Sequence, residues 1–326
     1  MMAGKLKILL TAGGTGSAWQ IAQTIDRFYK DRIELYLCDT NEMELVAASV
    51  YSDHFYTVPP VKSRGYAEYM YSLIRENGID VVIPLIPWEQ GYFAEDYKRF
   101  HELGIRSTAP LVRTARTLNH KKRLHDFCVE CRIPTIRVYE VNELKSDDTY
   151  FVKKLDGFGS MGAKRIKGAD LLAADKRVLD KLVIQEDCTG KGSRKDEPEE
   201  VTAECFYDGI ECQTVIRERL ETKSGVCTKA RFRHDEDIDR TVKTFTELLP
   251  FPPIFNIQFV RKGNKWLVMD VNLRLAAGTG LSAAAGFDAV RAMLANILGD
   301  QVDPKWLTLD TDVKTVLRVY QEVVIK

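Results

Sequence analysis

The chain has 326 residues, more than a typical single domain, so two or three lobes are expected. Its 47 lysines and arginines balance its 47 aspartates and glutamates, and this lack of a basic excess argues against nucleic acid as a partner. No segment approaches the roughly 18 consecutive apolar residues that a membrane helix needs. We therefore expect a soluble cytoplasmic protein that binds neither nucleic acid nor a membrane.

The seven cysteines are odd in number and lie in apolar segments, which indicates reduced core residues and not a disulfide framework. Cys128 and Cys131 form a CxxC spelling, but it lies in a helical pattern without a second pair. The five histidines show no HExxH or other ligand spacing. A zinc site is therefore not expected.

Strand and helix patterns alternate in the first third of the chain. The apolar run "KILLTA" is followed by the turn "GGTGS" and the helical spacing of "SAWQIAQTIDRFYK". The next strand, "IELYLCDT", contains Asp39, and residues 78–87 form another buried strand ahead of a helical stretch over 89–104. This order predicts an α/β domain with an open, doubly wound parallel sheet, whose ligands lie at the carboxyl ends of the strands.

The pattern changes after the first domain. Residues 114–133 predict one helix, which Pro134 ends. From residue 150 onward period-2 alternation dominates, and turns such as Asp208-Gly209 and Lys262-Gly263-Asn264 suit antiparallel hairpins. The second part of the chain is therefore expected to be α+β, with a solvated, charge-rich loop over 189–200.

A glycine-rich loop follows two lysines, with the spelling Gly157-x-Gly159-x-x-Gly162. A dinucleotide fingerprint needs these glycines to open a helix, but the alternating "AKRIK" that follows predicts a strand. The Walker A spelling GxxxxGK[ST] is absent from the sequence. Two interpretations remain: a hairpin whose backbone N–H groups cover phosphates, or a flexible surface hairpin without a ligand.

An ordered set of segments resembles the ATP-grasp superfamily, specifically single-copy proteins of the carbamoyl-phosphate synthase-like branch. The segments span essentially the whole chain and are "KILLTAGG", "IDVVIPLIPWEQ", "HKKRLHDFCVECRIPT", "FVKKLDGFGSMGA", "LVIQED", "NIQF" and "MDVNLRLAAGTGL". The resemblance implies a Rossmann-like pre-ATP-grasp domain over 1–112 and a subdomain with a mobile lid over 113–185. It implies a second ATP-grasp subdomain, with a metal site, over 186–326.

The resemblance also implies an ATP site. Lys121 and Lys153 match the two family lysines that hold ATP phosphates, which compact cations can neutralise. Glu186 and its neighbours resemble the strand that meets adenine, and Glu200 resembles the carboxylate that meets the ribose. The full set implied for ATP is Lys121, Lys153, Gly157, Gly159, Ser160, Gly162, Glu186, Asp187, Cys188 and Glu200.

A metal site is expected near the end of the chain. Asp270, Asn272 and Arg274 alternate along "MDVNLR", so they share one face of a strand. Hard oxygen ligands two residues apart suit Mg²⁺, and the resemblance adds Gln258 to this set. Arg274, with Lys153, is the expected catalytic cation at the transferred phosphoryl group.

Substrate residues are less sharply indicated. The "AGGTGS" loop, with Gly13 and Gly14, offers N–H groups to an anion. Glu89 follows a strand and is a candidate for holding an amino group, and Arg217 and Arg219 resemble arginines that face the acyl substrate.

Four positions depart from the family pattern: Asp270 replaces glutamate, His120 replaces an acid, and Lys154 and Leu273 replace prolines. The phosphate cations and the metal ligands are nevertheless retained.

The resemblance implies a carboxylate–amine (or ammonia) ligase that uses ATP and Mg²⁺ or Mn²⁺ and works through an acylphosphate. Its partners would be a small carboxylic acid and an amine or ammonia, with a homodimer left open. A non-catalytic ATP-binding subunit and a component of a split carbamoyl-phosphate synthase-type enzyme remain alternatives. A nicotinamide-dependent oxidoreductase is disfavoured because Trp19 occupies the third glycine position of the fingerprint.

Overall fold

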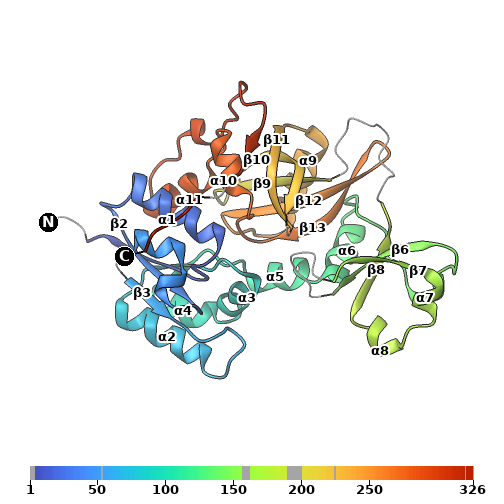
Figure 1. Cartoon of the computed structure of the whole chain (residues 1–326), viewed down its shortest axis with the longest axis horizontal. Helices are drawn as coiled ribbons and strands as arrows, with labels where there is room; N and C mark the ends of the chain where they lie inside the picture. The colour runs from blue at the N-terminus through green and yellow to red at the C-terminus, as the bar shows by residue number, and fades with distance from the viewer. Residues whose placement is uncertain are drawn as a thin grey trace.

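The computed structural model describes residues 4–52, 54–155, 162–188, 200–223, 225–319 and 321–325. Three sheets follow one another along the chain (Figure 1). A parallel sheet forms the N-terminal domain, a small sheet lies at the opposite end of the molecule, and a large sheet lies between them. No described helix is both long enough and apolar enough to cross a membrane.

The N-terminal sheet is parallel and doubly wound, as predicted. Its strand order is β3-β2-β1-β4-β5. Alternate residues of β1 face opposite sides: Ile8 packs in the core cluster that includes α1 and α11, and Leu9 packs in the cluster that includes α2 and α3. The elements are β1 (Leu6–Leu10), α1 (Gly16–Phe28), β2 (Ile33–Asp39), β3 (His54–Thr57), α2 (Tyr66–Asn77), β4 (Val81–Ile83), α3 (Pro87–Glu95), α4 (Tyr97–Glu102) and β5 (Arg106–Ser107), with short 3₁₀ helices at Met43–Leu45 and Ala47–Tyr51.

The single helix predicted over 114–133 is wrong. The structure has two helices, α5 (Val112–Leu118) and α6 (Lys121–Glu130). His120 separates them because its ring Nδ1 accepts the backbone N–H of Arg123 at 3.3 Å and so caps α6. The helical stretch over 89–104 is likewise divided, at Asp96, into α3 and α4.

The small sheet has the order β7-β6-β8 and is antiparallel. Because β6 pairs with β7 across the glycine-rich loop, the segment after the loop is a strand, as predicted, and the dinucleotide interpretation of that loop is excluded. Gly157, Gly159 and Ser160 lie outside the described residues. The elements are β6 (Thr149–Lys154), β7 (Lys164–Lys167), α7 (Gly168–Leu172), α8 (Lys176–Leu179) and β8 (Leu182–Glu186), after a 3₁₀ turn at Val141–Glu143.

The large sheet is antiparallel, with the order β13-β12-β9-β10-β11-β14. Helix α9 covers its apolar face, where Ile238, Val242 and Phe245 join a core of alternate strand residues. Helix α11 packs against α1 and so fixes this sheet to the N-terminal domain. The elements are β9 (Glu200–Tyr207), β10 (Cys212–Lys223), β11 (Val226–Arg233), α9 (Glu236–Leu248), β12 (Ile254–Lys262), β13 (Lys265–Asn272), α10 (Thr279–Ala284), α11 (Ala289–Leu298), a 3₁₀ turn at Pro304–Trp306, and β14 (Val316–Leu317).

Candidate functional site

On the face of the large sheet away from α9, neighbouring positions of β12 and β13 carry polar side chains. Val271 and Ile257 belong to the apolar core under α9, so the residues that alternate with them point the other way. In the β12–β13 ladder, Gln258 lies opposite Asp270, and Asn256 lies opposite Asn272. The register therefore brings all three predicted metal ligands, Gln258, Asp270 and Asn272, into neighbouring positions.

Lys121 reaches this face from the N-terminus of α6 and forms an ion pair with Asp270. The two side chains are 9% and 17% exposed, so the pair is largely shielded from water. Two residues that are 149 positions apart, one predicted for phosphate and one for metal, thus meet directly.

Lys153 extends from β6 of the small sheet toward the same place. Burial lowers its pKa, and the nearby cation Lys121 lowers it further, whereas Asp270 and Glu200 oppose the shift. Within the described part of the chain Lys153 forms no ion pair, although its ammonium lies 5.4 Å from the ring centre of Phe151. A half-buried, unpaired ammonium between two acids and a second lysine is well suited to receive an anion.

Arg274 lies just beyond the end of β13. Its Nη1 donates to the carbonyl of Leu275 at 2.9 Å, while its buried Nε has no hydrogen-bond partner among the described residues. Burial lowers the pKa of this guanidinium, and the negative charge of Asp270 counters the shift. Since buried donors are normally satisfied, this Nε, like the Lys153 ammonium, is suited to donate to an anionic ligand.

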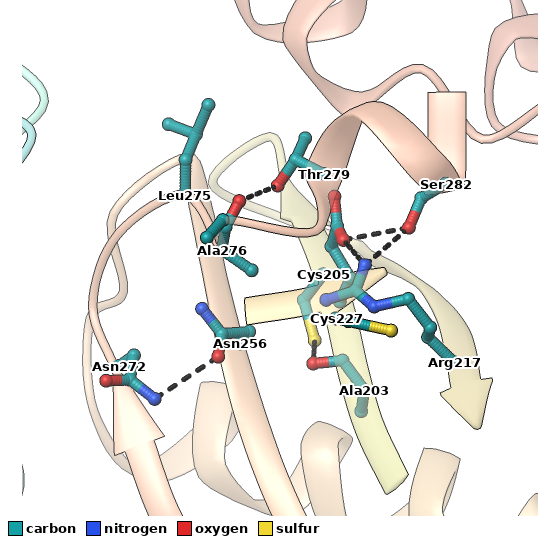
Figure 2. Close-up of polar contacts among 12 residues, drawn as sticks. Ala203, Cys205, Arg217, Cys227, Asn256, Asn272, Leu275, Ala276, Thr279 and Ser282 are labelled. Atoms are coloured by element: carbon teal, nitrogen blue, oxygen red, sulfur yellow. Dashed lines mark hydrogen bonds and ion pairs between the residues drawn. The ribbon is translucent and has the colours of Figure 1, made fainter. Parts of the chain in front are cut away.

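The donor set fits Mg²⁺. Asp270 supplies one carboxylate, and Asn272 donates its Nδ2 to Asn256 Oδ1 at 3.2 Å, as Figure 2 shows, so its own Oδ1 is not engaged by this contact. A carboxylate and amide oxygens are the hard ligands that Mg²⁺ takes when phosphate oxygens complete its coordination. The described residues contain no cluster of three His, Cys, Asp or Glu side chains, so a site built only from protein carboxylates is not present among them.

The residues predicted to contact adenine and ribose lie at the end of β8 in the small sheet and at the start of β9 in the large sheet. Glu186, at the end of β8, pairs with Lys262 at 2.7 Å, and Asp187 pairs with Arg165 at 3.0 Å. Glu200 begins β9 and lies 3.7 Å from Arg219. Cys188 is buried in a small apolar cluster, and Gly162 has a φ of 79° in the turn that enters β7.

Arg217 does not face an open substrate site. Its Nη1 donates to Glu204 Oε2 at 2.5 Å and to Ser282 Oγ at 2.8 Å, and Ser282 also donates to Glu204 at 2.9 Å (Figure 2). Arg217 is 2% exposed and Glu204 is fully buried. The predicted substrate role for Arg217 therefore needs correction: it ties α10 to the sheet.

A second polar cluster lies at the carboxyl ends of β1, β2 and β4, which is the switch point of the parallel sheet. Thr11 donates to the buried carboxylate of Glu89 at 2.5 Å, and the hydroxyl of Tyr66, 2% exposed, meets the geometric criteria for a hydrogen bond with none of the described residues. Burial, with a smaller contribution from Asp39, raises the pKa of Glu89 to about 7.

The anion site predicted for the "AGGTGS" loop does not fit. The N–H of Gly13 donates to the Cys38 carbonyl at 2.9 Å, and the N–H of Gly14 donates to the Asp39 carboxylate at 2.8 Å. Both donors are used by the end of β2, and the Asp39 carboxylate there would repel an anion. These glycines are needed for close packing, because a Cβ on Gly13 would lie 2.8 Å from Leu37 Cγ.

Gln90 connects the two clusters and was not predicted. Its Nε2 donates to the carbonyl of Leu273 at 2.8 Å, so the helix that carries Glu89 packs on the strand end that carries Asn272 and Arg274. Glu204 and Ser282 were missed as well, since a buried ion pair between distant segments has no local sequence signal.

Comparison with known proteins agrees with this geometry. Residues 8–108 match the family model described as PylC-like, N-terminal domain, and residues 197–319 match the model described as ATP-grasp in the biosynthetic pathway with Ter operon. No curated protein matches the sequence.

Several solved structures share the fold. The biotin carboxylase domain dimer of 2-oxoglutarate carboxylase from Hydrogenobacter thermophilus, in complex with MgADP, ADP and bicarbonate, superposes with a TM-score of 0.73 at 14% identity over 92% of this chain and 71% of that chain. N5-carboxyaminoimidazole ribonucleotide synthetase from Thermus thermophilus gives 0.66 at 12% identity over 91% and 79%. Glycinamide-RNase-transformylase T from Mycobacterium tuberculosis gives 0.65 at 13% identity over 91% and 82%.

The fold is thus a Rossmann-like domain joined to two further sheets that enclose a cation-rich site. The model that matches residues 197–319 is an ATP-grasp model, and the chain as a whole shares the fold of these solved structures. Its place in the carbamoyl-phosphate synthase-like branch, and the three domain boundaries, remain predictions.

Proposed function

We propose that the protein is an ATP- and Mg²⁺-dependent ligase that joins a carboxylic acid to an amine or ammonia through an acylphosphate. The observation that carries the proposal is the meeting of Lys121, Lys153 and Arg274 around Asp270. These three cations and one carboxylate come from the small sheet, the large sheet and α6. The cations can bind the phosphates of ATP, and the carboxylate can bind the metal ion that accompanies them. Such a site can stabilise the charge that develops during phosphoryl transfer without a covalent nucleophile.

Each side chain has a role in this scheme. Lys121 and Lys153 would hold the phosphates of ATP, and Arg274 would hold the phosphoryl group as it passes to the substrate carboxylate. Asp270 and Asn272, with Gln258 beside them, would hold Mg²⁺ (or Mn²⁺), which when bound neutralises phosphate charge. Closing the small sheet over the large one would exclude water from the acylphosphate.

Glu89 is the best candidate for the nitrogen substrate. It lies buried at the switch point, beside Thr11, Tyr66 and Asp39, and Gln90 holds its helix against the strand end that bears Arg274. A carboxylate with a pKa near 7 could accept a hydrogen bond from an amine and then take the proton released as the amine attacks.

The alternatives make distinct claims. A non-catalytic subunit would bind ATP without turnover, and a split carbamoyl-phosphate synthase component would need a second subunit. A nicotinamide-dependent oxidoreductase would use Asp39 for a ribose hydroxyl, but Asp39 already accepts from Gly14 and Asn41.

The deciding experiment is a screen for ADP release over a matrix of carboxylic acids and amines, with ammonia included. The proposal expects at least one acid–amine pair for which ADP formation depends on both partners and on Mg²⁺. ATP binding without ADP from any pair would favour the non-catalytic subunit, and binding of NAD(P) in place of ATP would favour the oxidoreductase.

A further inference from the structure

A cavity of about 480 Å³ lies beside the phosphate site. It is bounded by the first turn of α3, by the junction of α5 and α6, and by the end of β13. Lys121 and Asn272 line it and also belong to the proposed ATP and metal site, and Trp88 of α3 lines it as well. The cavity therefore adjoins the proposed phosphoryl-transfer centre, and the helix that carries Glu89 forms part of its wall.

The lining is strongly basic. It includes Arg116, Lys121, Arg123 and His120, and none of the described lining residues is an aspartate or a glutamate. Asp270 neutralises Lys121. Among the described residues Arg116 pairs with Glu95 alone, at 3.7 Å, and both side chains are 66% exposed and hence weakly coupled.

Arg123 pairs with no carboxylate of the described chain; its Nη1 donates to the backbone carbonyl of Arg116 at 3.3 Å. A net positive charge therefore faces the cavity.

The first turn of α6 strengthens this positive field. Lys121, Lys122 and Arg123 occupy its first three positions, and the turn itself contains no acidic residue. Cations at a helix N-terminus are unfavourable because the helix dipole is positive at that end. Lys122 is compensated by Glu140, but Arg123 is not. An anion in the cavity would offset the charge of Arg123 and the dipole together.

We infer that this cavity binds a second anionic group of the carboxylate substrate, either a phosphate monoester or a second carboxylate. The identification of the ligand as the substrate rests on the proposed function. The carboxylate to be activated would lie near Asn272 and Lys121, and the distal anion would be held by Arg116 and Arg123, with His120 as a further donor. A planar guanidinium fork matches the oxygens of either anion.

Anion binding can be measured without knowing the substrate. Inorganic phosphate and succinate would be titrated by calorimetry into the full-length protein, with its ATP site saturated by Mg²⁺ and a non-hydrolysable ATP analogue. We expect at least one of the two anions to bind. The Arg116→Gln/Arg123→Gln double variant should weaken that binding by at least about tenfold, as expected for the loss of a charge-assisted hydrogen bond.

Arg113→Gln is the matched control, because Arg113 is exposed on the same helix as Arg116 but does not line the cavity. It should leave the affinity for the anion unchanged, and all three proteins should bind the ATP analogue equally. Preference for phosphate would identify a phosphate monoester, and preference for succinate would identify a second carboxylate.

Three results would overturn the inference: binding of neither anion, equal affinity in the double variant, or complete displacement of the anion by nucleotide, which would make the cavity part of the ATP site. Failure of the proposed function has a different signature. In that case no acid–amine pair would release ADP, or the ATP analogue would not bind at all, and titration of the two anions, into nucleotide-free protein if necessary, would still test the cavity.

Discussion

Lys121 and Asp270 meet on the polar face of the large sheet, although one lies at the start of α6 and the other near the end of β13. Each was predicted to serve a different part of bound MgATP. In the free protein they neutralise one another, so neither charge is left uncompensated in a shielded place. We expect nucleotide binding to separate them: the ammonium would move to phosphate oxygens while the carboxylate takes the metal.

Asp270→Asn should abolish ATP turnover while leaving the fold intact. The amide matches the carboxylate in size but cannot supply the charge that holds the metal, and it leaves Lys121 without its partner. ADP release, circular dichroism and the Mg²⁺ dependence of activity measure the three consequences. Asp312→Asn, at an exposed position, is the control. Retained activity with an unchanged Mg²⁺ requirement would place the metal elsewhere.

Lys153→Ala should weaken ATP binding far more than adenosine binding, by about tenfold or more for ATP, because the lost contact is to phosphate. Lys154 provides the matched control on the same strand, since neighbouring residues of a strand face opposite ways and Lys154 is exposed. Lys154→Ala should change both affinities little. Isothermal titration with the two ligands decides the matter, and an equal loss for ATP and adenosine would contradict the assignment.

The phosphate and metal residues were predictable because each lies in a local pattern. Asp270, Asn272 and Arg274 are spaced two apart on a strand, so their common face follows from strand geometry alone. The link between Lys121 and Asp270 was not predictable, since it depends on how α6 packs against β13. The break between α5 and α6 was missed because a histidine cap carries a weak signal within an otherwise helical pattern.

Arg217 and Glu204 are a second example of contacts that the sequence did not predict. The alternation of Arg217 and Arg219, with the family resemblance, suggested a substrate arginine, but Ser282, 65 residues from Arg217, completes a buried cluster around it. Arg217 and Glu204 are buried because α10 packs over them. The periodicity of the sequence does not predict where α10 packs. The site residues that alternate along one strand could thus be proposed from local spacing, whereas those that hold the elements together could not.

Arg217→Met should destabilise the protein by about 3–5 kcal/mol, because Glu204 would be left as an unpaired buried charge. The Arg217→Met/Glu204→Gln double variant should lose less than the sum of the two single changes, since neither charge remains. Urea unfolding of the four proteins gives the coupling energy. Simple additivity would show that the pair is not coupled in solution.

Gly278→Ala tests the position of the Arg217 guanidinium, against which Gly278 packs. A Cβ at this position would lie 2.5 Å from Cζ of Arg217, so the guanidinium would have to move. We expect a loss of stability in the wild-type background and a much smaller loss in Arg217→Met, where the crowding atoms are absent. An equal loss in both backgrounds would assign the effect to the glycine backbone and not to the arginine.

Glu89 should make the stability of the protein depend on pH. Burial raises its pKa from 4.5 to about 7, so the folded state holds a proton that the unfolded state releases. Its contribution is fully present below pH 4.5 and is lost as the pH rises through 7, by about 3 kcal/mol at most. Glu89→Gln, which stays neutral, should therefore gain stability relative to wild type between pH 5 and pH 8.

Urea unfolding at several pH values measures this difference directly. Glu44→Gln, at an exposed position, should follow the wild-type profile. Parallel profiles for wild type and Glu89→Gln would show that Glu89 titrates alike in the folded and unfolded states.

The chemistry itself is tested by the acylphosphate. Cations gather around the expected γ-phosphate position, and among the described site residues no side chain is placed as a covalent nucleophile, so the substrate carboxylate should attack phosphorus directly. With the acid but no amine, hydroxylamine should capture the intermediate as a hydroxamate. With both substrates, oxygen-18 from the carboxylate should appear in the released phosphate, because that oxygen bridges carbon and phosphorus before the amine displaces it. Adenylation would instead give AMP and pyrophosphate. If ADP forms while the label stays wholly in the organic product, the phosphoryl group goes to another acceptor, and the site around Asp270 serves a different phosphoryl transfer.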